Sequence, residues 1–466
     1  MARPIAPDYG QQFLLPPALE DWVPQDHPAR FLREFVDQLD LPTLGLVMAQ
    51  STDGRPPYAP SLLLKIWLFG YMHRIYSTRK LEVACREQLS LLWLCGLLQP
   101  DHNSLWRFWR HNKQVLRALF KHSAQLAVQA GLVGLVLQAV DGTKIQAAAS
   151  GHTAWNKKQL QELLDALDRQ LDQAEAQMDR EVAPEPGSGY RLAENLAQPE
   201  ALRQRVQAGL QQMEQAQREH LHPHEPEARR MQCDGKNRFA YNAQAVVDEK
   251  TGVIVAAEVT NQENDTGLAV PMVRQAEQNC GGPAAATVAD CGYGSGVDIG
   301  QAARQQVNLL VRPAMDSVAA QKRFHAYNFS YDPERDRVRC PEGKELHFAR
   351  HMKQKGQTVR IFRCEHYDCP VRAQCTRDQR QRRLVEIWSH TAAVQEMRAR
   401  IKEPTAADQL RKRPQIIERV FGHIKQHEGW RRWTVRGLQA VNAQWALVCC
   451  AYNLRLLYRK WSLTAT

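Results

Sequence analysis

The sequence predicts an α/β protein in which a mixed-sheet domain follows an all-helical domain and carries one helical and one cysteine-rich insertion. Three observations predict this class. Apolar residues recur at helical spacing through the first 130 residues. Short apolar runs typical of buried strands follow at 136–140, 243–247, 253–259, 284–289 and 307–311. A long charged helical pattern and a cluster of four cysteines interrupt these strands.

The length of 466 residues allows two or three domains. We place a helical N-terminal domain at 1–130 and the sheet domain at 131–466. The helical insertion is expected at 150–235 and the cysteine-rich insertion at 315–405. Two antiparallel strands, a helix and two further strands follow the first strand, and this order fits an RNase H-like sheet.

The chain is basic, with 61 Lys and Arg against 50 Asp and Glu, a net charge of +11. This excess favours a polyanionic partner, nucleic acid before a membrane surface, although a basic protein without such a partner stays an alternative. The apolar stretch 440–457 contains Asn442, Gln444 and Asn453, so it does not predict a membrane span. Eleven cysteines without a secreted disulfide pattern favour a cytoplasmic location.

Helices are predicted at 62–71, 81–98 and 116–128, and another opens at Ser104. The latter reads LWRFWR, with Arg107 and Arg110 between aromatic residues. Such a helix suits a nucleic-acid surface through stacking and phosphate contacts. A helix with its aromatic residues in the core and its arginines in solvent is an equal alternative.

The first strand, 136–140, is expected to stop at Asp141, because Gly142 follows and Asp-Gly is a common turn pair. The run 284–289 likewise ends on Asp290 and a glycine-rich turn. Two carboxylates at neighbouring strand ends can bind Mg²⁺, although Asp141 alone also fits a plain turn residue.

A third acid has four candidates: Glu386, Glu396, Glu403 and Glu418. Glu418 lies on a predicted amphipathic helix at 415–426. Residues seven apart share a helix face, so Lys425 is expected beside Glu418. The alternative is a solvated helix face. Asp265 is read as a helix cap, and Asn242 receives no role.

The helical insertion is predicted as two helices, 155–180 and 201–217, which either fold on each other or pair with a second protomer. The link between them is expected at 184–189. The cysteine-rich insertion holds Cys340, Cys364, Cys369 and Cys375. Their spacing is a moderate signal for a Zn²⁺ site, and free thiols packed in a small β-subdomain are the alternative.

Seven motifs carry a resemblance when taken together and in order. They are GRPPYAPSLLLKIWLFGYMHRIYSTRKLE (54–82), QPDHNSLWRFWRHNK (99–113), AVDGTKI (139–145), AYNAQAVVD (240–248), VADCGYG (288–294), IIERVFGHIK (416–425) and WALVCCAYNL (445–454). This series resembles the DDE transposases of bacterial insertion sequences and spans most of the chain.

The resemblance implies a DNA transposase that cleaves and joins the ends of its own element. Asp141, Asp290 and Glu418 would hold two Mg²⁺ ions, for which Mn²⁺ can substitute. The N-terminal domain would bind the terminal inverted repeats, and a homodimer on DNA would bring two ends and a target together. The protein would be cytoplasmic and associated with the nucleoid when bound. DNA contacts are expected from Lys425, Arg107, Arg110, Arg411, Arg413 and Arg436.

The resemblance departs at Pro414, where many relatives carry an arginine four residues before the glutamate. The nearest basic residues are Arg411, Lys412 and Arg413, so the arginine that grips the substrate stays open. Two other functions remain as alternatives: a simple RNase H-like nuclease, and a catalytically inactive DNA-binding protein derived from a transposase.

Overall fold

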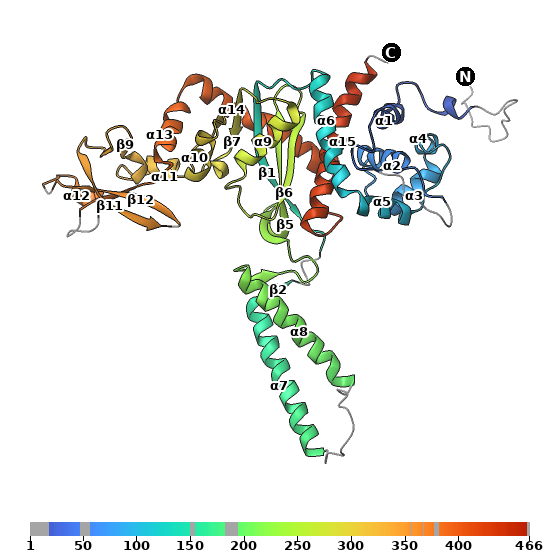
Figure 1. Cartoon of the computed structure of the whole chain (residues 1–466), viewed down its shortest axis with the longest axis horizontal. Helices are drawn as coiled ribbons and strands as arrows, with labels where there is room; N and C mark the ends of the chain where they lie inside the picture. Colours follow the sequence, from blue (N-terminus) through green and yellow to red (C-terminus); the bar gives the residue numbers. More distant parts are fainter. Residues whose placement is uncertain are drawn as a thin grey trace, which may run out of the picture.

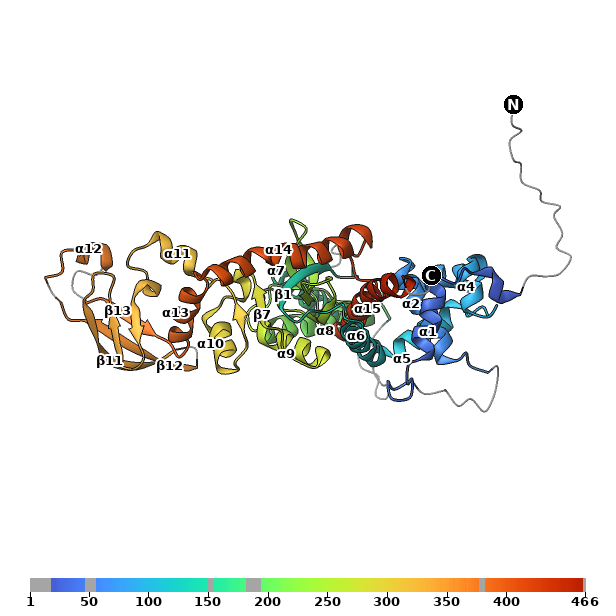
Figure 2. The same ribbon diagram turned by 90° about the horizontal axis from the view of Figure 1, so that it is seen from above.

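The computed structural model describes residues 18–46, 56–149, 154–181, 194–354, 356–366, 368–376 and 382–463. It has a mixed α/β architecture, as the sequence predicts. Helices of the N-terminal region pack on one side of a central mixed sheet (Figure 1). A small antiparallel sheet lies on the opposite side (Figures 1 and 2), and a long helical hairpin projects away from the central sheet (Figure 1). The predicted link at 184–189 lies outside the described residues.

The N-terminal region is helical, as expected. Its helices are α1 (Pro28–Asp37), α2 (Pro60–Met72), α3 (Thr78–Glu87), α4 (Leu89–Leu94), α5 (His102–His111) and α6 (Lys113–Gln129). The prediction of a single helix at 81–98 is wrong, because the helix is interrupted at Gln88. This residue adopts the extended conformation (φ −94°, ψ 117°) and ends α3 where α4 begins.

The central sheet has six strands in the order β4-β5-β1-β7-β8, with β6 paired to β5. The strands are β1 (Leu137–Gln146), β4 (Arg229–Cys233), β5 (Lys236–Asp248), β6 (Ile254–Thr260), β7 (Ala286–Ala289) and β8 (Leu309–Leu310). β1 pairs antiparallel with β5 and parallel with β7. Helix α9 (Ala269–Cys280) packs on β6, and α10 (Gly296–Arg304) follows β7. Strand β4 was not predicted.

The C-terminal helix α15 (Leu438–Ser462) packs against α6, β6 and α2. Two asparagines of α15 form hydrogen bonds with the backbone of β6, as a further strand would. Asn442 accepts a hydrogen bond from the Val259 N–H and donates to the same residue's carbonyl, and Asn453 bonds both backbone groups of Ile254. Because these side chains pair buried backbone groups of β6, they explain the polar residues in this apolar helix. No described helix has the length and apolar character needed to cross a membrane.

The helical insertion is a hairpin of α7 (Lys157–Glu181) and α8 (Glu194–Gln215), closed at its base by the short strands β2 (Trp155–Asn156) and β3 (His220–Leu221). Leu160, Val206, Leu210 and Met213 form a small core between the helices. The hairpin therefore folds back on itself, which was one of the two predicted arrangements.

The cysteine-rich insertion contains a five-stranded antiparallel sheet in the order β13-β12-β11-β10-β9. Its strands are β9 (Ser330–Asp332), β10 (Arg337–Arg339), β11 (Glu345–Gln354), β12 (Gln357–Cys364) and β13 (Leu384–Ile387), accompanied by α11 (Asp316–Gln321) and α12 (Arg372–Cys375). Helix α13 (Thr391–Arg400) packs on α10, and α14 (Pro404–Gly422) returns the chain to the central sheet.

Candidate active site

Asp141 and Asp290 lie side by side because β1 and β7 are parallel neighbours. Val140 pairs with Ala289, so the next residue on each strand is an aspartate. Asp290 ends β7 as predicted and caps the following 3₁₀ turn, where it accepts a hydrogen bond of 2.8 Å from the Gly292 N–H. The prediction that the first strand stops at Asp141 is wrong, since β1 continues to Gln146.

Gly142 does not form the predicted turn, because it lies inside β1. A Cβ atom built on it would collide with Gln244 Nε2 and would lie 2.7 Å from Asn242 Oδ1 and 2.8 Å from Asp265 Oδ1. Glycine is needed here because polar side chains pass directly over its Cα.

Gly142→Ala is therefore expected to destabilise the protein by about 1–3 kcal/mol, the usual cost of overpacking. Urea unfolding measures this change. Gly282→Ala is the matched control, because no atom lies within 4 Å of its Cβ position. Equal unfolding midpoints for Gly142→Ala and the wild type would show that the side chains over Gly142 can move aside without a loss of stability.

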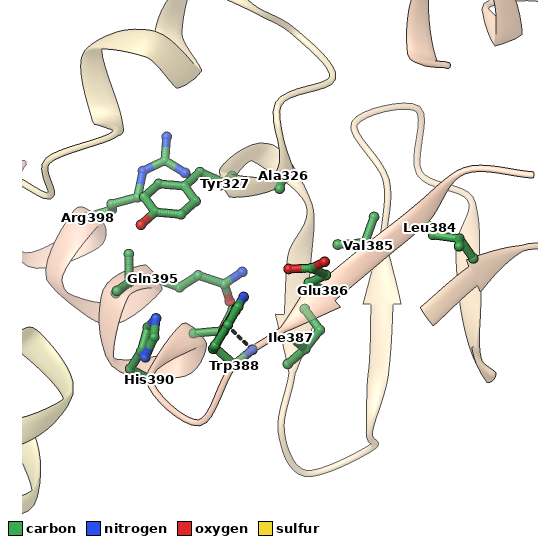
Figure 3. Close-up of a pocket in the computed structure, with 12 residues that line it drawn as sticks. Ala326, Tyr327, Leu384, Val385, Glu386, Ile387, Trp388, His390, Gln395 and Arg398 are labelled. Atoms are coloured by element: carbon green, nitrogen blue, oxygen red, sulfur yellow. Dashed lines mark hydrogen bonds between the residues drawn. The ribbon is translucent and has the colours of Figure 1, made fainter. Parts of the chain in front are cut away.

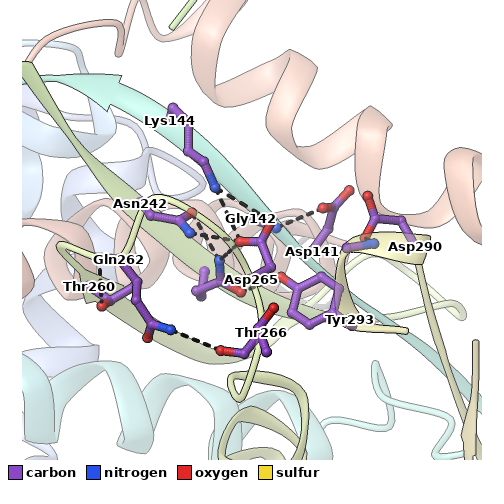
Figure 4. Close-up of polar contacts among 12 residues, drawn as sticks. Asp141, Gly142, Lys144, Asn242, Thr260, Gln262, Asp265, Thr266, Asp290 and Tyr293 are labelled. Atoms are coloured by element: carbon purple, nitrogen blue, oxygen red, sulfur yellow. Dashed lines mark hydrogen bonds and ion pairs between the residues drawn. The ribbon is translucent and has the colours of Figure 1, made fainter. Parts of the chain in front are cut away.

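The polar side chains over Gly142 form a connected network (Figure 4). Asp265 Oδ1 accepts hydrogen bonds from Asn242 (2.7 Å) and Gln244 (2.8 Å), and Lys144 Nζ lies 3.2 Å away. Tyr293 donates to Gln244 Oε1. Burial, together with the charges of Asp265, Asp141 and Asp290, raises the pKa of Tyr293 well above its usual range. Asp265 is thus the acceptor that holds the strands' polar groups, and its reading as a helix cap is wrong.

Helix α14 carries Arg413, which contacts Asp141, and Glu418, which lies near Arg413. Arg413 Nη1 donates to Asp141 Oδ2 at 2.8 Å, and Arg413 Nη2 lies 3.9 Å from Glu418 Oε1. The side chain of Asp141 is 17% exposed, whereas that of Glu418 is 67% exposed. Arg413 therefore lies between a buried and an exposed carboxylate. Of the three basic residues that precede Pro414, Arg413 is the one that pairs with Asp141.

The electrostatics at Asp141 favour an added cation. Burial raises the pKa of Asp141 from 3.8 to about 6, the Arg413 guanidinium lowers it, and the neighbouring Asp290 carboxylate raises it. Two carboxylates that repel each other in a half-buried place fit a hard divalent cation. Arg413 supplies part of that positive charge in the present arrangement.

Among the described residues, no group of three or more His, Cys, Asp or Glu side chains is arranged to hold a metal ion. Asp141 and Asp290 lie next to each other, and Glu418 is linked to Asp141 through Arg413. Within the described part of the chain, Glu386, Glu396 and Glu403 form no ion pair with Arg413, whose carboxylate partners are Asp141 and Glu418. Glu386 lies on β13, where it lines a separate cavity of about 310 Å³ with Trp388 and Tyr327 (Figure 3).

Lys425 does not lie on the predicted α-helix. Helix α14 ends at Gly422, and His423–His427 form a π-helical turn. Lys425 Nζ lies 3.4 Å from Asp234 Oδ1 and 3.4 Å from the Lys144 carbonyl oxygen. The seven-residue spacing from Glu418 therefore does not place the two on one α-helical face, and Lys425 is engaged by a carboxylate.

The remaining basic candidates are exposed. Arg107 and Arg110 extend from α5, and Arg436 precedes α15. Arg411 is exposed and lies 3.4 Å from Asp408. On α5, Phe108 and Trp109 are buried while Trp106 is 43% exposed, so this helix combines the two predicted arrangements.

The four cysteines gather at one end of the small sheet. Burial raises the pKa of Cys375, and the nearby thiols of Cys340, Cys364 and Cys369 add to this effect. The Lys344 N–H donates to Cys340 Sγ at 3.3 Å. All four are free and half-buried, and Cys340, Cys364 and Cys375 pack against the core of the small sheet. The structure brings the four thiols together, and zinc binding stays a prediction.

Zinc analysis of the purified, reduced protein tests that prediction. About one equivalent of zinc per chain is expected if the thiols are ligands, and Cys369→Ser should lose it. Cys280→Ser, a buried cysteine on α9, is the matched control and should keep it. Protein that contains no zinc would leave the packed-thiol arrangement as the role of the cluster.

Two family models match this chain. The model described as "Transposase domain (DUF772)" matches residues 17–111, and the model described as "Transposase DDE domain" matches residues 339–458. The second match contains Arg413, Glu418 and Lys425, whereas Asp141 and Asp290 lie outside both. No curated protein and no solved structure matches the chain.

Proposed function

We propose that this chain, a transposase with an N-terminal transposase domain and a DDE domain, cleaves the ends of an insertion sequence and transfers them to target DNA by divalent-cation catalysis. The observation that carries the proposal is the parallel register of β1 and β7. It sets Asp141 beside Asp290, and α14 adds Glu418 through Arg413.

The strand order supports an RNase H-like assignment for the central sheet. Three antiparallel strands (β6, β5 and β1) are followed by two parallel strands (β7 and β8), and the helical hairpin is inserted after β1. Active sites of open α/β sheets lie where neighbouring strands present polar residues past the core. Asp290 directly follows the last residue of β7, and Asp141 lies beside it on β1, which supports placing the active site here.

Each residue near the aspartates has a proposed task. Asp141 and Asp290 would hold the cations, and Glu418 would complete the set from the exposed side. Bound Mg²⁺ would activate water or a DNA 3′-hydroxyl and stabilise the leaving 3′-oxygen. Arg413 would leave Asp141 and contact the phosphate next to the cleaved bond. The Asp265 network would hold β1 and β5 rigid beneath Asp141.

The DNA would extend over the exposed basic residues. Arg107 and Arg110 would contact the terminal repeat, and Arg411, Arg436 and Lys425 would contact strands near the acidic residues. Lys425 must first exchange Asp234 for a phosphate. Two copies of the chain would pair on two DNA ends, because joining both ends to one target requires two active sites.

A strand-transfer assay separates the proposed function from its two alternatives. A labelled duplex that carries the inverted repeat flanking the gene is incubated with the protein, Mg²⁺ and a target plasmid. Transfer of the labelled strand to the plasmid is expected. Hydrolysis without transfer would identify a nuclease, and binding without cleavage would identify an inactive DNA-binding protein.

Cation binding is expected to weaken as the pH falls through about 6, because protons compete with the cation for Asp141. Unfolding at low pH would not explain this loss of affinity. Because the pKa of Asp141 is raised in the folded state, its protonation stabilises the folded protein as the pH falls from about 6 towards 4. Calorimetric titration with Mn²⁺ between pH 5 and 8 measures the affinity. An affinity that stays constant across this range would exclude Asp141 as a ligand.

A further inference from the structure

Asp265 brings a further carboxylate to the neighbourhood of the aspartate pair from a different part of the chain. It lies in the segment between β6 and α9, and Figure 4 shows it near Gly142 and Tyr293, with Asp141 and Asp290. Its side chain is 18% exposed, almost the same as the 17% of Asp141. The hydrogen bonds that hold β1 and β5 occupy mainly one of its two oxygens, so the other oxygen has no role yet.

The two oxygens of Asp265 have very different surroundings. Oδ1 accepts hydrogen bonds from Asn242 (2.7 Å) and Gln244 (2.8 Å), and Lys144 Nζ lies 3.2 Å from it. Within the described ranges, the contact of Oδ2 is Lys144 Nζ at 3.5 Å, which is long for a hydrogen bond. A carboxylate oxygen in a mostly buried place normally accepts closer bonds. Oδ2 therefore has room for another donor.

The nearby phenol of Tyr293 does not supply that donor. Its hydroxyl group donates to Gln244 Oε1. Burial and the charges of Asp265, Asp141 and Asp290 raise the pKa of Tyr293, so the phenol keeps its single proton for Gln244. A donor for Asp265 Oδ2 has to come from the solvent or from a ligand.

Gly292 leaves a space between Asp265 and Asp290. A Cβ atom at Gly292 would lie 2.9 Å from Asp290 Oδ1 and 3.4 Å from Asp265 Oδ2, so these two oxygens are no further apart than the two distances combined. The backbone does not require glycine here, because Gly292 lies outside the left-handed region. The missing side chain therefore serves the space itself, which opens on two carboxylate oxygens.

We propose that Asp265 is a positioning residue of the cation site, whose Oδ2 accepts a hydrogen bond from a water molecule on the cation beside Asp141 and Asp290. The inference rests on the proposed function for the presence of that cation. Carboxylates that do not touch a metal ion often hold its ligands in this way. Such a role agrees with the lack of a three-ligand cluster among the described residues. Lys144 offsets the charge of Asp265, so that three carboxylates can gather.

Calorimetric titration of the full chain with Mn²⁺, without DNA, tests this role. Asp265→Asn should weaken the affinity by about 10–100-fold, the usual effect of losing such a carboxylate. Asp298→Asn is the matched control and should keep the wild-type affinity. Asp298 is another buried acid, and its hydrogen bonds come from the Gly267 N–H and the Ser295 hydroxyl group. Equal affinities of Asp265→Asn and the wild type would overturn the proposal.

Gly292→Ala examines the same contact without changing a charge, and it serves as the test if Asp265→Asn does not fold. The added methyl group fills the space between the two oxygens, so Mn²⁺ affinity should fall. Because both substitutions remove one contact, the double variant should bind about as tightly as the weaker single variant. Losses that add up in the double variant would overturn the proposal and show two independent effects.

The luminescence lifetime of bound Eu³⁺ in H₂O and D₂O reports how many water molecules the ion carries. Asp265→Asn should leave this number unchanged, whereas Asp290→Ala should raise it, because a direct ligand is then replaced by water. A higher number in Asp265→Asn would make Asp265 a direct ligand and overturn the role through water. Failure of the proposed function is separate, because it appears in the wild type as absent Mn²⁺ binding or absent cleavage.

Discussion

Asp141→Asn is expected to reduce Mg²⁺-dependent cleavage by about 10⁴-fold, the scale for losing one member of a catalytic set that acts as a unit. The substitution keeps the shape of the side chain and removes the charge that would hold the cation. Asp141 is the buried member of the acidic set. The charge of Asp290 raises the pKa of Asp141, and Arg413 donates a hydrogen bond to it. Single-turnover cleavage of an element end measures the effect, and Asp290→Asn should behave alike.

DNA binding separates a loss of chemistry from a loss of fold. Asp141→Asn should bind the same duplex in EDTA with the affinity of the wild type. Asp408→Asn is the matched control, because Asp408 is an exposed acid on the same helix as Glu418 and pairs with Arg411. Cleavage by Asp141→Asn at a rate near that of the wild type would remove this residue from the active site.

Arg413→Gln is expected to change cation binding and cleavage in opposite directions. The guanidinium now neutralises Asp141, so its removal should tighten Mn²⁺ binding by about 10-fold, the order expected for one nearby unit charge after screening. Cleavage should fall by at least about 100-fold, because the phosphate beside the cleaved bond loses its positioning cation. Calorimetric titration and single-turnover cleavage give the two numbers.

Two further variants control this experiment. Arg413→Lys keeps the charge and should leave Mn²⁺ affinity near the wild-type value, while the loss of the two-armed guanidinium still slows cleavage. Arg411→Gln removes a mostly exposed cation that pairs with Asp408, and it should leave the Mn²⁺ affinity unchanged. A weaker rather than tighter affinity in Arg413→Gln would show that Arg413 supports the cation instead of replacing it.

The sequence predicted which aspartates come together but for a partly wrong reason. Asp141 and Gly142 look like a turn because local propensity cannot distinguish a turn from a strand that needs a glycine. The need arises from Asn242, Gln244 and Asp265, which pass over Gly142 from other elements. A signal was present, because Asn242 and Gln244 lie two residues apart, on one face of the otherwise apolar part of β5 from Phe239 to Val247.

Other parts of the site depend on contacts that local sequence patterns do not contain. Arg413 meets Asp141 across 272 residues of chain, so no spacing rule connects them. Lys425 follows a helical pattern in the sequence, yet the turn that contains it is π-helical. The helices and strands that carry these residues were predictable from apolar periodicity, whereas the residue-by-residue register of β1 and β7 was not.

Iron-directed cleavage of the protein backbone tests the central claim most directly. Fe²⁺ replaces Mg²⁺ at oxygen-ligand sites, and peroxide then generates radicals that cut the chain next to the bound ion. Cuts near Asp141, Asp290 and Glu418, all suppressed by excess Mg²⁺, are the expected result. Cuts that fall elsewhere, or that persist in Asp141→Asn, would contradict a cation site formed by these three residues.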